Sequence, residues 1–142
     1  MAGYFTKLNG RVYDGGHIAA APLENGTFVV INANDKVVAS AANTNIEFAC
    51  VEKTDLWGEP ALRLRCEKED GTVFMVENDP LIYVAEEYDE AHRTCKAGEY
   101  VKMRTPNVGD EIFLGVTDAI YEAATVGAKY NVAANGAIAK KA

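Results

Sequence analysis

Histidine and cysteine are scarce in this sequence, with two and three residues among 142, and their scarcity limits the chemistry that the chain can perform. Structural zinc sites recruit four ligands that stand in recognisable pairs along the chain, and one such pair exists here, His92 with Cys95. The cysteines are odd in number and widely spaced, so no disulfide framework is expected and the thiols should stay reduced. We therefore predict a chain without a metal ion or a cofactor.

Basic charge and long apolar runs are also lacking. Fourteen Lys and Arg stand against 21 Asp and Glu, which gives a net charge of −7, and affinity for nucleic acid depends on neutralising phosphates with basic side chains. No apolar run reaches the roughly 18 residues of a membrane-spanning helix, and the first residues lack the charged start and apolar middle of a signal peptide. The chain is therefore expected to be made in the cytoplasm and to bind neither nucleic acid nor a membrane.

What the sequence does contain is a series of short, half-apolar segments separated by turn residues. A polar Asn-Ala-Asn-Asp stretch inside residues 27–40 predicts a hairpin. Asp70-Gly71 predicts a second hairpin, between a strand over 62–67 and a strand over 72–76. Asn135-Gly136 predicts a third, because this dipeptide tolerates the positive φ angles of a two-residue turn.

Alternation along these segments places one face of a strand in the core and the other in water. Free cysteine behaves as a small hydrophobe, so two of the cysteines are expected to pack in the core. The alternating core residues are Ile46, Phe48, Cys50, Leu62, Leu64 and Cys66. Two short helices are also predicted, over 86–96 from a lysine and glycine at its end, and over 117–124 from a Thr or Asp cap.

Eight to ten short strands with one or two helical turns predict a mainly β fold, a small β-barrel or β-sandwich. Residues 26–142 are expected to form a single β-rich domain. Residues 1–25 form either an extended N-terminal arm or the first strands of that domain. An arm would present these residues to a partner: Tyr4, Phe5, Leu8, Val12 and Tyr13. Trp57, in a turn-rich loop, is either a buried plug or a further partner-binding anchor.

Few residues could support catalysis. Cys95 and His92 would lie on one helix face as a nucleophile and its base, and His17 stands in the glycine-rich first segment. The acidic cluster over 86–90 lacks the glycine that a calcium loop needs, so it is expected to be a solvated face. A solvated histidine on a polar helix explains His92 better, the position of Cys95 matches no known site, and we expect no enzymatic activity.

The last third of the chain has a recognisable cadence, in which short strands alternate with glycine turns. Its segments are Glu99–Arg104, Val108–Val116 and Gly127–Val132, followed by the Asn135-Gly136 turn. This pattern, together with the aromatic and glycine-rich first segment, resembles the tailed-phage capsid decoration (cement) proteins. The resemblance implies a non-enzymatic virion protein on the capsid surface. Its implied partners are the major capsid protein and copies of itself, as a homotrimer.

Two other functions are compatible with the pattern. One is another small structural protein of a phage head or tail. The other is a barrel-type binding module for an oligosaccharide or a single-stranded nucleic acid, which would need a basic groove with stacking aromatics. Arg63, Arg65, Lys102 and Arg104 could line such a groove, although the acidity of the chain opposes it.

Overall fold

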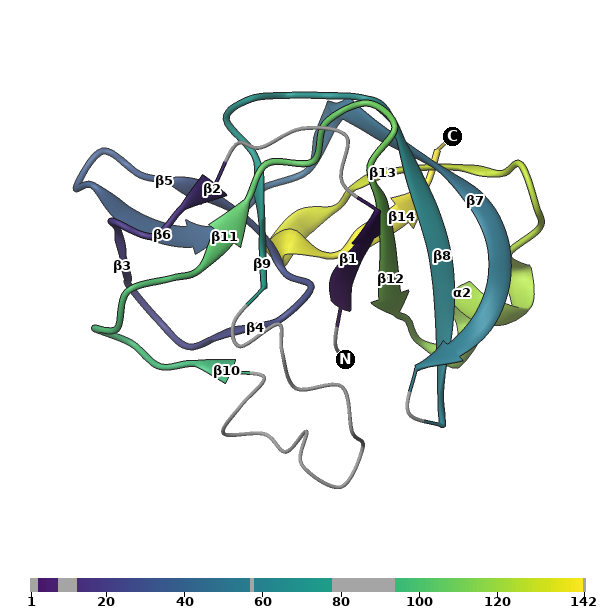
Figure 1. The fold of residues 1–142 in the computed structure, drawn as a ribbon, viewed down its shortest axis with the longest axis horizontal. Coiled ribbons are helices and arrows are strands. Elements are labelled where there is room, and N and C mark those ends of the chain that lie inside the picture. The colour runs from purple at the N-terminus through teal and green to yellow at the C-terminus, as the bar shows by residue number, and fades with distance from the viewer. Residues whose placement is uncertain (1–2, 8–12, 57, 78–93, 142) are drawn as a thin grey trace.

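The structure is a computed structural model, and it describes residues 3–7, 13–56, 58–77 and 94–141. Strands dominate these residues, which confirms the mainly β fold predicted from the sequence. Figure 1 shows two sheets side by side, one of them curled like half a barrel, with a short helix at one end of it. Among the described residues, no helix is long and apolar enough to cross a membrane.

Each of the two main sheets has six strands. Sheet A has the order β1 (Gly3–Lys7), β12 (Glu111–Gly115), β8 (Glu59–Lys68), β7 (Asn43–Leu56), β13 (Lys129–Val132) and β14 (Ile138–Lys140). Sheet B has the order β2 (Tyr13–Asp14), β11 (Met103–Arg104), β9 (Phe74–Val76), β5 (Phe28–Ile31), β6 (Lys36–Ala39) and β3 (Ile18–Ala19). A separate pair joins β4 (Leu23–Glu24) to β10 (Thr94–Cys95). Within sheet B, β3 and β6 run parallel.

The longest strands, β7 and β8, form the hairpin that gives sheet A its curl (Figure 1). The register between them shifts at Glu47/Phe48 and again at Cys50/Glu52, and such bulges bend a strand and increase its twist. Along β8 the predicted alternation is confirmed: Leu62, Leu64 and Cys66 are fully buried while the charged residues between them are not.

The alternation predicted for β7 holds less well, because both faces are covered between residues 46 and 50. Glu47 is only 7% exposed. Its carboxylate accepts a 2.8 Å hydrogen bond from Lys141, which follows β14 at the end of the chain. The ion pair explains how a carboxylate occupies a buried position in this sheet.

The structure confirms two of the three predicted hairpins and contradicts the third. The first is confirmed, since β5 and β6 pair antiparallel around residues 32–35. The hairpin predicted at Asp70-Gly71 is wrong, because β8 belongs to sheet A while β9 pairs with β5 and β11 in sheet B. A turn signal specifies a local change of direction, but the next strand here crosses to the other sheet.

The hairpin predicted at Asn135-Gly136 is confirmed by the antiparallel pairing of β13 with β14. Asn135 and Gly136 both have positive φ angles, 61° and 70°. They lie in a short 3-10 turn, Ala134–Gly136, that the Ala133 amide closes with a 2.8 Å hydrogen bond to the Ala137 carbonyl. The link is therefore longer than the two-residue turn that the dipeptide suggested.

The helix predicted over 117–124 is confirmed as α2 (Asp118–Ala123), and the Thr117 side chain caps it by accepting from the Ile120 amide. The other predicted helix, 86–96, lies outside the described residues up to 93. Its last part, Thr94–Cys95, is strand β10 rather than a helix.

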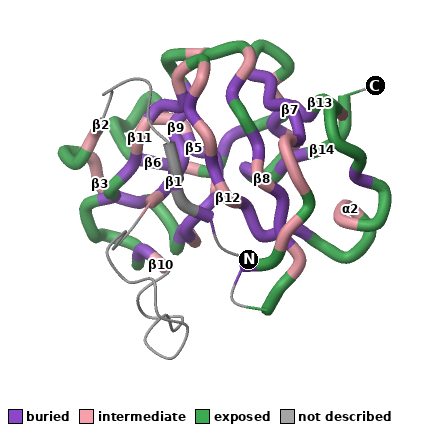
Figure 2. Tube along the Cα trace, turned by 45° about the vertical axis from the view of Figure 1, so that its right-hand side comes forward, coloured by how far each residue is buried: buried purple, intermediate pink, exposed green. Residues whose placement is uncertain are grey.

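Two clusters of buried side chains form the core, and Figure 2 colours the buried residues purple along the backbone. The larger cluster lies inside sheet A and receives Phe28 from sheet B, whose ring packs 5.3 Å from that of Phe48. The smaller cluster lies on sheet B, around Val29, Val37 and Met103. Cys50 and Cys66 belong to the larger cluster, as predicted.

The described part of the N-terminal segment consists of strands that pair with strands from later in the chain. Gly3–Lys7 pairs with β12, Tyr13–Asp14 with β11, and Ile18–Ala19 with β6. Phe5 is 9% exposed and belongs to the larger core cluster. Residues 3–7 are therefore held by sheet A of their own chain.

Candidate functional site

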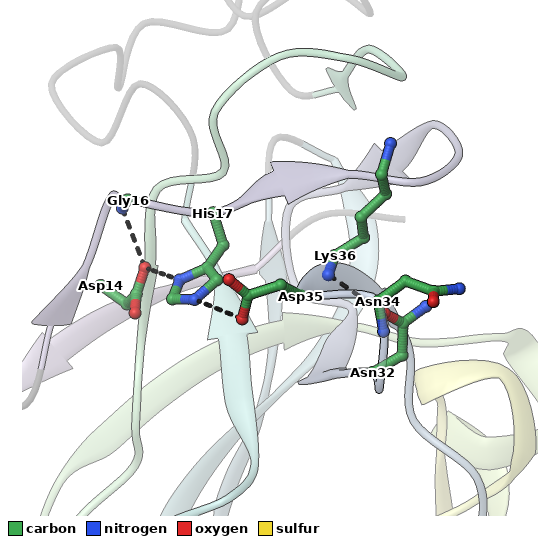
Figure 3. Close-up of polar contacts among 7 residues, drawn as sticks. All are labelled: Asp14, Gly16, His17, Asn32, Asn34, Asp35 and Lys36. Atoms are coloured by element: carbon green, nitrogen blue, oxygen red, sulfur yellow. Dashed lines mark hydrogen bonds and ion pairs between the residues drawn. The ribbon is translucent and has the colours of Figure 1, made fainter.

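A cluster of polar contacts surrounds His17, just after β2 (Figure 3). The imidazole Nδ1 lies 2.9 Å from Oδ1 of Asp14, and Nε2 lies 3.4 Å from Oδ1 of Asp35. The Gly16 amide donates a 2.9 Å hydrogen bond to the same Asp14 oxygen. The histidine ring therefore lies between carboxylates from two separate parts of the chain.

The turn between β5 and β6 places Asp35 beside the imidazole. The Asn32 side-chain oxygen accepts hydrogen bonds from the Asn34 and Lys36 amides, and the Asp35 amide donates to the Asn32 carbonyl. Asn and Asp favour such turns because their side chains bond to nearby backbone groups. Asp35 adopts a left-handed conformation, with φ of 65°, which non-glycine residues seldom do. The turn thus places Asp35 next to His17.

Both ring nitrogens of His17 are engaged, and this limits its chemistry. The hydrogen bond to Asp14 raises the pKa of His17, and the negative charge of Asp35 adds to the effect. A histidine that activates a nucleophile needs one nitrogen on a carboxylate and the other facing a hydroxyl or thiol. Here a second carboxylate takes that place. The arrangement suits a cation held between two anions rather than a catalytic base.

The cysteines are equally unsuited to catalysis. Cys95 is 1% exposed, and burial raises the pKa of its thiol, whereas a nucleophilic cysteine needs an accessible thiolate. The proposed base, His92, lies outside the described residues. Within the described ranges, no group of three or more His, Cys, Asp or Glu side chains is placed to hold a metal ion.

The outer face of sheet A carries cross-strand pairs of charges. Arg63 on β8 lies between Glu52 of β7 and Glu111 of β12, at 3.4 and 3.7 Å. Arg65 and Lys129 both approach Glu67, at 3.9 and 3.5 Å. Carboxylates therefore accompany Arg63 and Arg65, two of the three arginines that a basic groove would use.

Three large apolar side chains remain exposed on the described surface. Val126, after α2, is 72% exposed, Tyr100 is 64% exposed and Val108 is 44% exposed. All three lie in loops between strands of the last third of the chain. No sequence pattern singled them out, because the exposure of a loop residue depends on how the neighbouring strands pack.

Two small pockets flank helix α2. One, of about 210 Å³, lies among the β4–β5 loop, the end of β12 and the β13–β14 link. The other, of about 190 Å³, is lined by Ala119, Ile120, Ala123, Tyr130 and Lys140. Ile120 lines both pockets.

The contact residues predicted from the sequence are not gathered into one surface by the described residues. Phe5 lies in the core. Tyr4 pairs with Phe113 in sheet A, and Tyr13 pairs with Arg104 in sheet B. The others, Leu8, Val12 and Trp57, lie outside the described residues.

The sequence reasoning missed the His17 cluster, although part of the signal was present. Asp14 and His17 stand three residues apart around two glycines, a spacing that allows a local contact. Asp35 ends the polar stretch that predicted the first hairpin. Their meeting depends on β3 pairing parallel to β6, which no local pattern reveals. Comparison of the chain with protein-family models, with curated proteins and with solved structures finds no match.

Proposed function

We propose that this chain is a non-enzymatic structural protein of a virion, which decorates and stabilises a phage capsid through protein–protein contacts. Its partners would be the major capsid protein and copies of itself, in a homotrimer. The observation that supports this best is the set of exposed apolar side chains on a firmly packed β body, Tyr100, Val108 and Val126. The cadence of the last third of the sequence points to the same class of protein.

The size of the pockets agrees with a role in contact. Sites for small molecules usually enclose about 300–1,000 Å³, and the pockets beside α2 measure about 210 and 190 Å³. A volume of this size accommodates a side chain from a partner protein more readily than a metabolite. The lining of the second pocket is apolar apart from Lys140 and the Tyr130 hydroxyl.

Modest contacts suffice for such a protein, because a lattice repeats them. Linking several binding sites turns each further contact into an intramolecular event, so the combined affinity far exceeds that of one site. A net charge of −7 favours solubility before assembly. The paired charges on the outer face of sheet A leave no strongly basic field there to attract unrelated anions.

The test combines two measurements on the purified full-length protein. Its mass in solution should be three times the 15.3 kDa of one chain, and it should co-sediment with phage capsids that lack their decoration protein. Tyr100→Ser and Val126→Ser should each lower co-sedimentation about tenfold, the loss expected from removing a contact worth about 1.4 kcal/mol. Thr44→Ser, at an exposed position on β7, is the control and should bind normally.

Different results would redirect or overturn the proposal. Sedimentation with isolated tails and not with capsids would assign the chain to the tail instead. A monomer that binds no phage particle would overturn the proposal. So would salt-dependent retention on a polynucleotide column, which would favour a nucleic-acid-binding module.

A further inference from the structure

His17 connects three segments of the chain that are distant in sequence. Its ring joins Asp14, at the end of β2, to Asp35, in the β5–β6 turn. Its backbone carbonyl accepts a 2.9 Å hydrogen bond from the Val101 amide. Two residues later, Ala19 exchanges hydrogen bonds with the same loop, donating to the Glu99 carbonyl and accepting from the Gly98 amide. The histidine is therefore the point where β3, the β5–β6 turn and the 98–101 loop meet.

The two ring contacts respond differently to the loss of a proton. With both nitrogens protonated, His17 donates to Asp14 at 2.9 Å and faces Asp35 as a cation at 3.4 Å. A neutral imidazole keeps one N–H, and the shorter contact with Asp14 retains it. The other nitrogen then presents a lone pair to the Asp35 carboxylate, so the attraction becomes repulsion between two acceptors.

We propose that the Asp14–His17–Asp35 cluster is a proton-dependent latch, which holds the β5–β6 turn against the β2–β3 segment while His17 is a cation and releases it when the proton leaves. The released group is Asp35, which is 85% exposed and leaves the imidazole without disturbing the core.

The other charged groups near His17 are directed elsewhere or bound to other partners, so the two aspartates are the charges that act on the ring. Lys36, the next residue after Asp35, extends its side chain away from the imidazole (Figure 3). The Glu99 carboxylate, in the 98–101 loop, accepts from the Lys96 amide at 2.8 Å. Arg104, on β11 beside β2, acts on the Glu77 carboxylate. Lys102 is exposed on the segment that leads into β11.

The direction of the pH dependence follows from the pKa of His17. The hydrogen bond to Asp14 and the charges of both aspartates raise that pKa above 6.5 in the folded protein. The contribution to stability is therefore complete below pH 6.5 and is lost as the pH rises through the folded value. The latch is closed in mildly acidic solution and opens on the alkaline side of pH 6.5.

Opening of the latch would affect the exposed 98–101 loop, because this loop is hydrogen-bonded to the β2–β3 segment. Tyr100, 64% exposed, lies in this loop and forms an isolated bridge with Ile18, the residue after His17. Loosening β3 therefore changes how one of the three exposed apolar side chains is presented. The latch is independent of what the protein decorates, since it operates within one chain.

Nuclear magnetic resonance of the two histidine rings in the full-length protein tests the latch. His17→Gln removes one of the two ring signals and so assigns the other. We expect His17 to titrate with a midpoint above 6.5, Asp35→Asn to lower that midpoint, and Asp14→Asn to lower it further. Asp55→Asn removes the same charge from the end of β7, beside the β7–β8 turn, and this control should leave the midpoint unchanged.

The opening itself is measured at backbone amides. The amide signals of residue 35 and Val101 should shift with the His17 midpoint in the native sequence, and the shift should be smaller in Asp35→Asn, where the exposed position has a positive φ that asparagine also adopts. A midpoint at or below 6.5 overturns the latch, as does a midpoint that Asp35→Asn leaves in place. The proposal is also overturned if the amide chemical shifts of Asp35 and Val101 do not change as His17 titrates. None of these results depends on whether the protein binds a capsid.

Discussion

The backbone amide of Phe5 donates a 2.6 Å hydrogen bond to the side chain of Glu77, 72 residues later in the chain. Phe5 lies on β1, at one edge of sheet A, and Glu77 directly follows β9 of sheet B. This contact ties the first strand of the chain to the opposite sheet. Burial raises the pKa of the Glu77 carboxyl, against the opposing effects of the Phe5 amide and of Arg104.

Replacing Glu77 by Gln should change how stability depends on pH. A raised carboxyl pKa means that the folded protein keeps this proton to a higher pH than the unfolded chain, whose value is about 4.5. The native protein therefore loses stability as the pH rises from 4.5 through the folded pKa. Glu77→Gln lacks this loss, so urea unfolding should show its stability improving relative to the native protein between pH 4 and pH 7.

The matched control is Glu122→Gln, which removes one carboxylate from the exposed surface of α2. A stability difference between Glu77→Gln and the native protein that stays constant with pH would contradict the prediction. Glu77→Ala removes the acceptor altogether. It should cost about 1–3 kcal/mol near pH 4, because the Phe5 amide loses its partner, and less at higher pH, because the native protein itself loses stability there.

Gly136 should tolerate no side chain. Its φ is +70°, and an added Cβ would overlap the Phe28 carbonyl oxygen and lie 2.6 Å from Cγ2 of Thr27. Gly136→Ala should therefore lower the free energy of unfolding by more than the roughly 1–2 kcal/mol of an unfavourable backbone conformation alone. Gly127→Ala is the control, since Gly127 has φ of +90° and open space around it. Equal losses in the two variants would show that Thr27 and Phe28 move aside.

The aromatic pair that joins the two sheets should be a major source of stability. Phe28 of β5 and Phe48 of β7 are both fully buried, with ring centroids 5.3 Å apart and planes inclined by 42°. Phe28→Ala should cost about 3–5 kcal/mol in urea unfolding. A double-mutant cycle with leucine at both positions should give a coupling of about 0.5–1.5 kcal/mol. Tyr100→Ala, at an exposed ring, should change stability little, and additive leucine substitutions would argue against direct coupling.

The elements that sequence reasoning found are those whose signals are local. The polar link of the first hairpin, the Asn135-Gly136 turn and the Thr117 cap of α2 each depend on residues within one turn of each other. Alternation along β8 also located core residues, because one side of that strand faces the interior and the other faces solvent.

The elements that it missed depend on which strands meet. Asp70-Gly71 marks a turn correctly as a change of direction, yet the chain passes from sheet A to sheet B there. Asp35 reaches His17 because β3 lies parallel to β6, a pairing between segments joined by a long excursion. Glu47 is buried because Lys141 arrives from the far end of the chain. Such contacts follow from tertiary packing between distant segments, so neither the hydrophobic periodicity nor the turn residues of the sequence predict them.

The three thiols should resist modification in the folded protein. Cys50, Cys66 and Cys95 are each at most 2% exposed, and burial raises all three pKa values, that of Cys66 to about 12. A thiol reagent attacks the thiolate, so both access and ionisation oppose the reaction. At pH 8 we expect negligible labelling of the native protein over a time in which all three thiols react in denaturant. Rapid labelling of Cys95 alone in the native protein would contradict this and would revive a role for that thiol; Cys95→Ser, which removes the site, identifies the labelled residue.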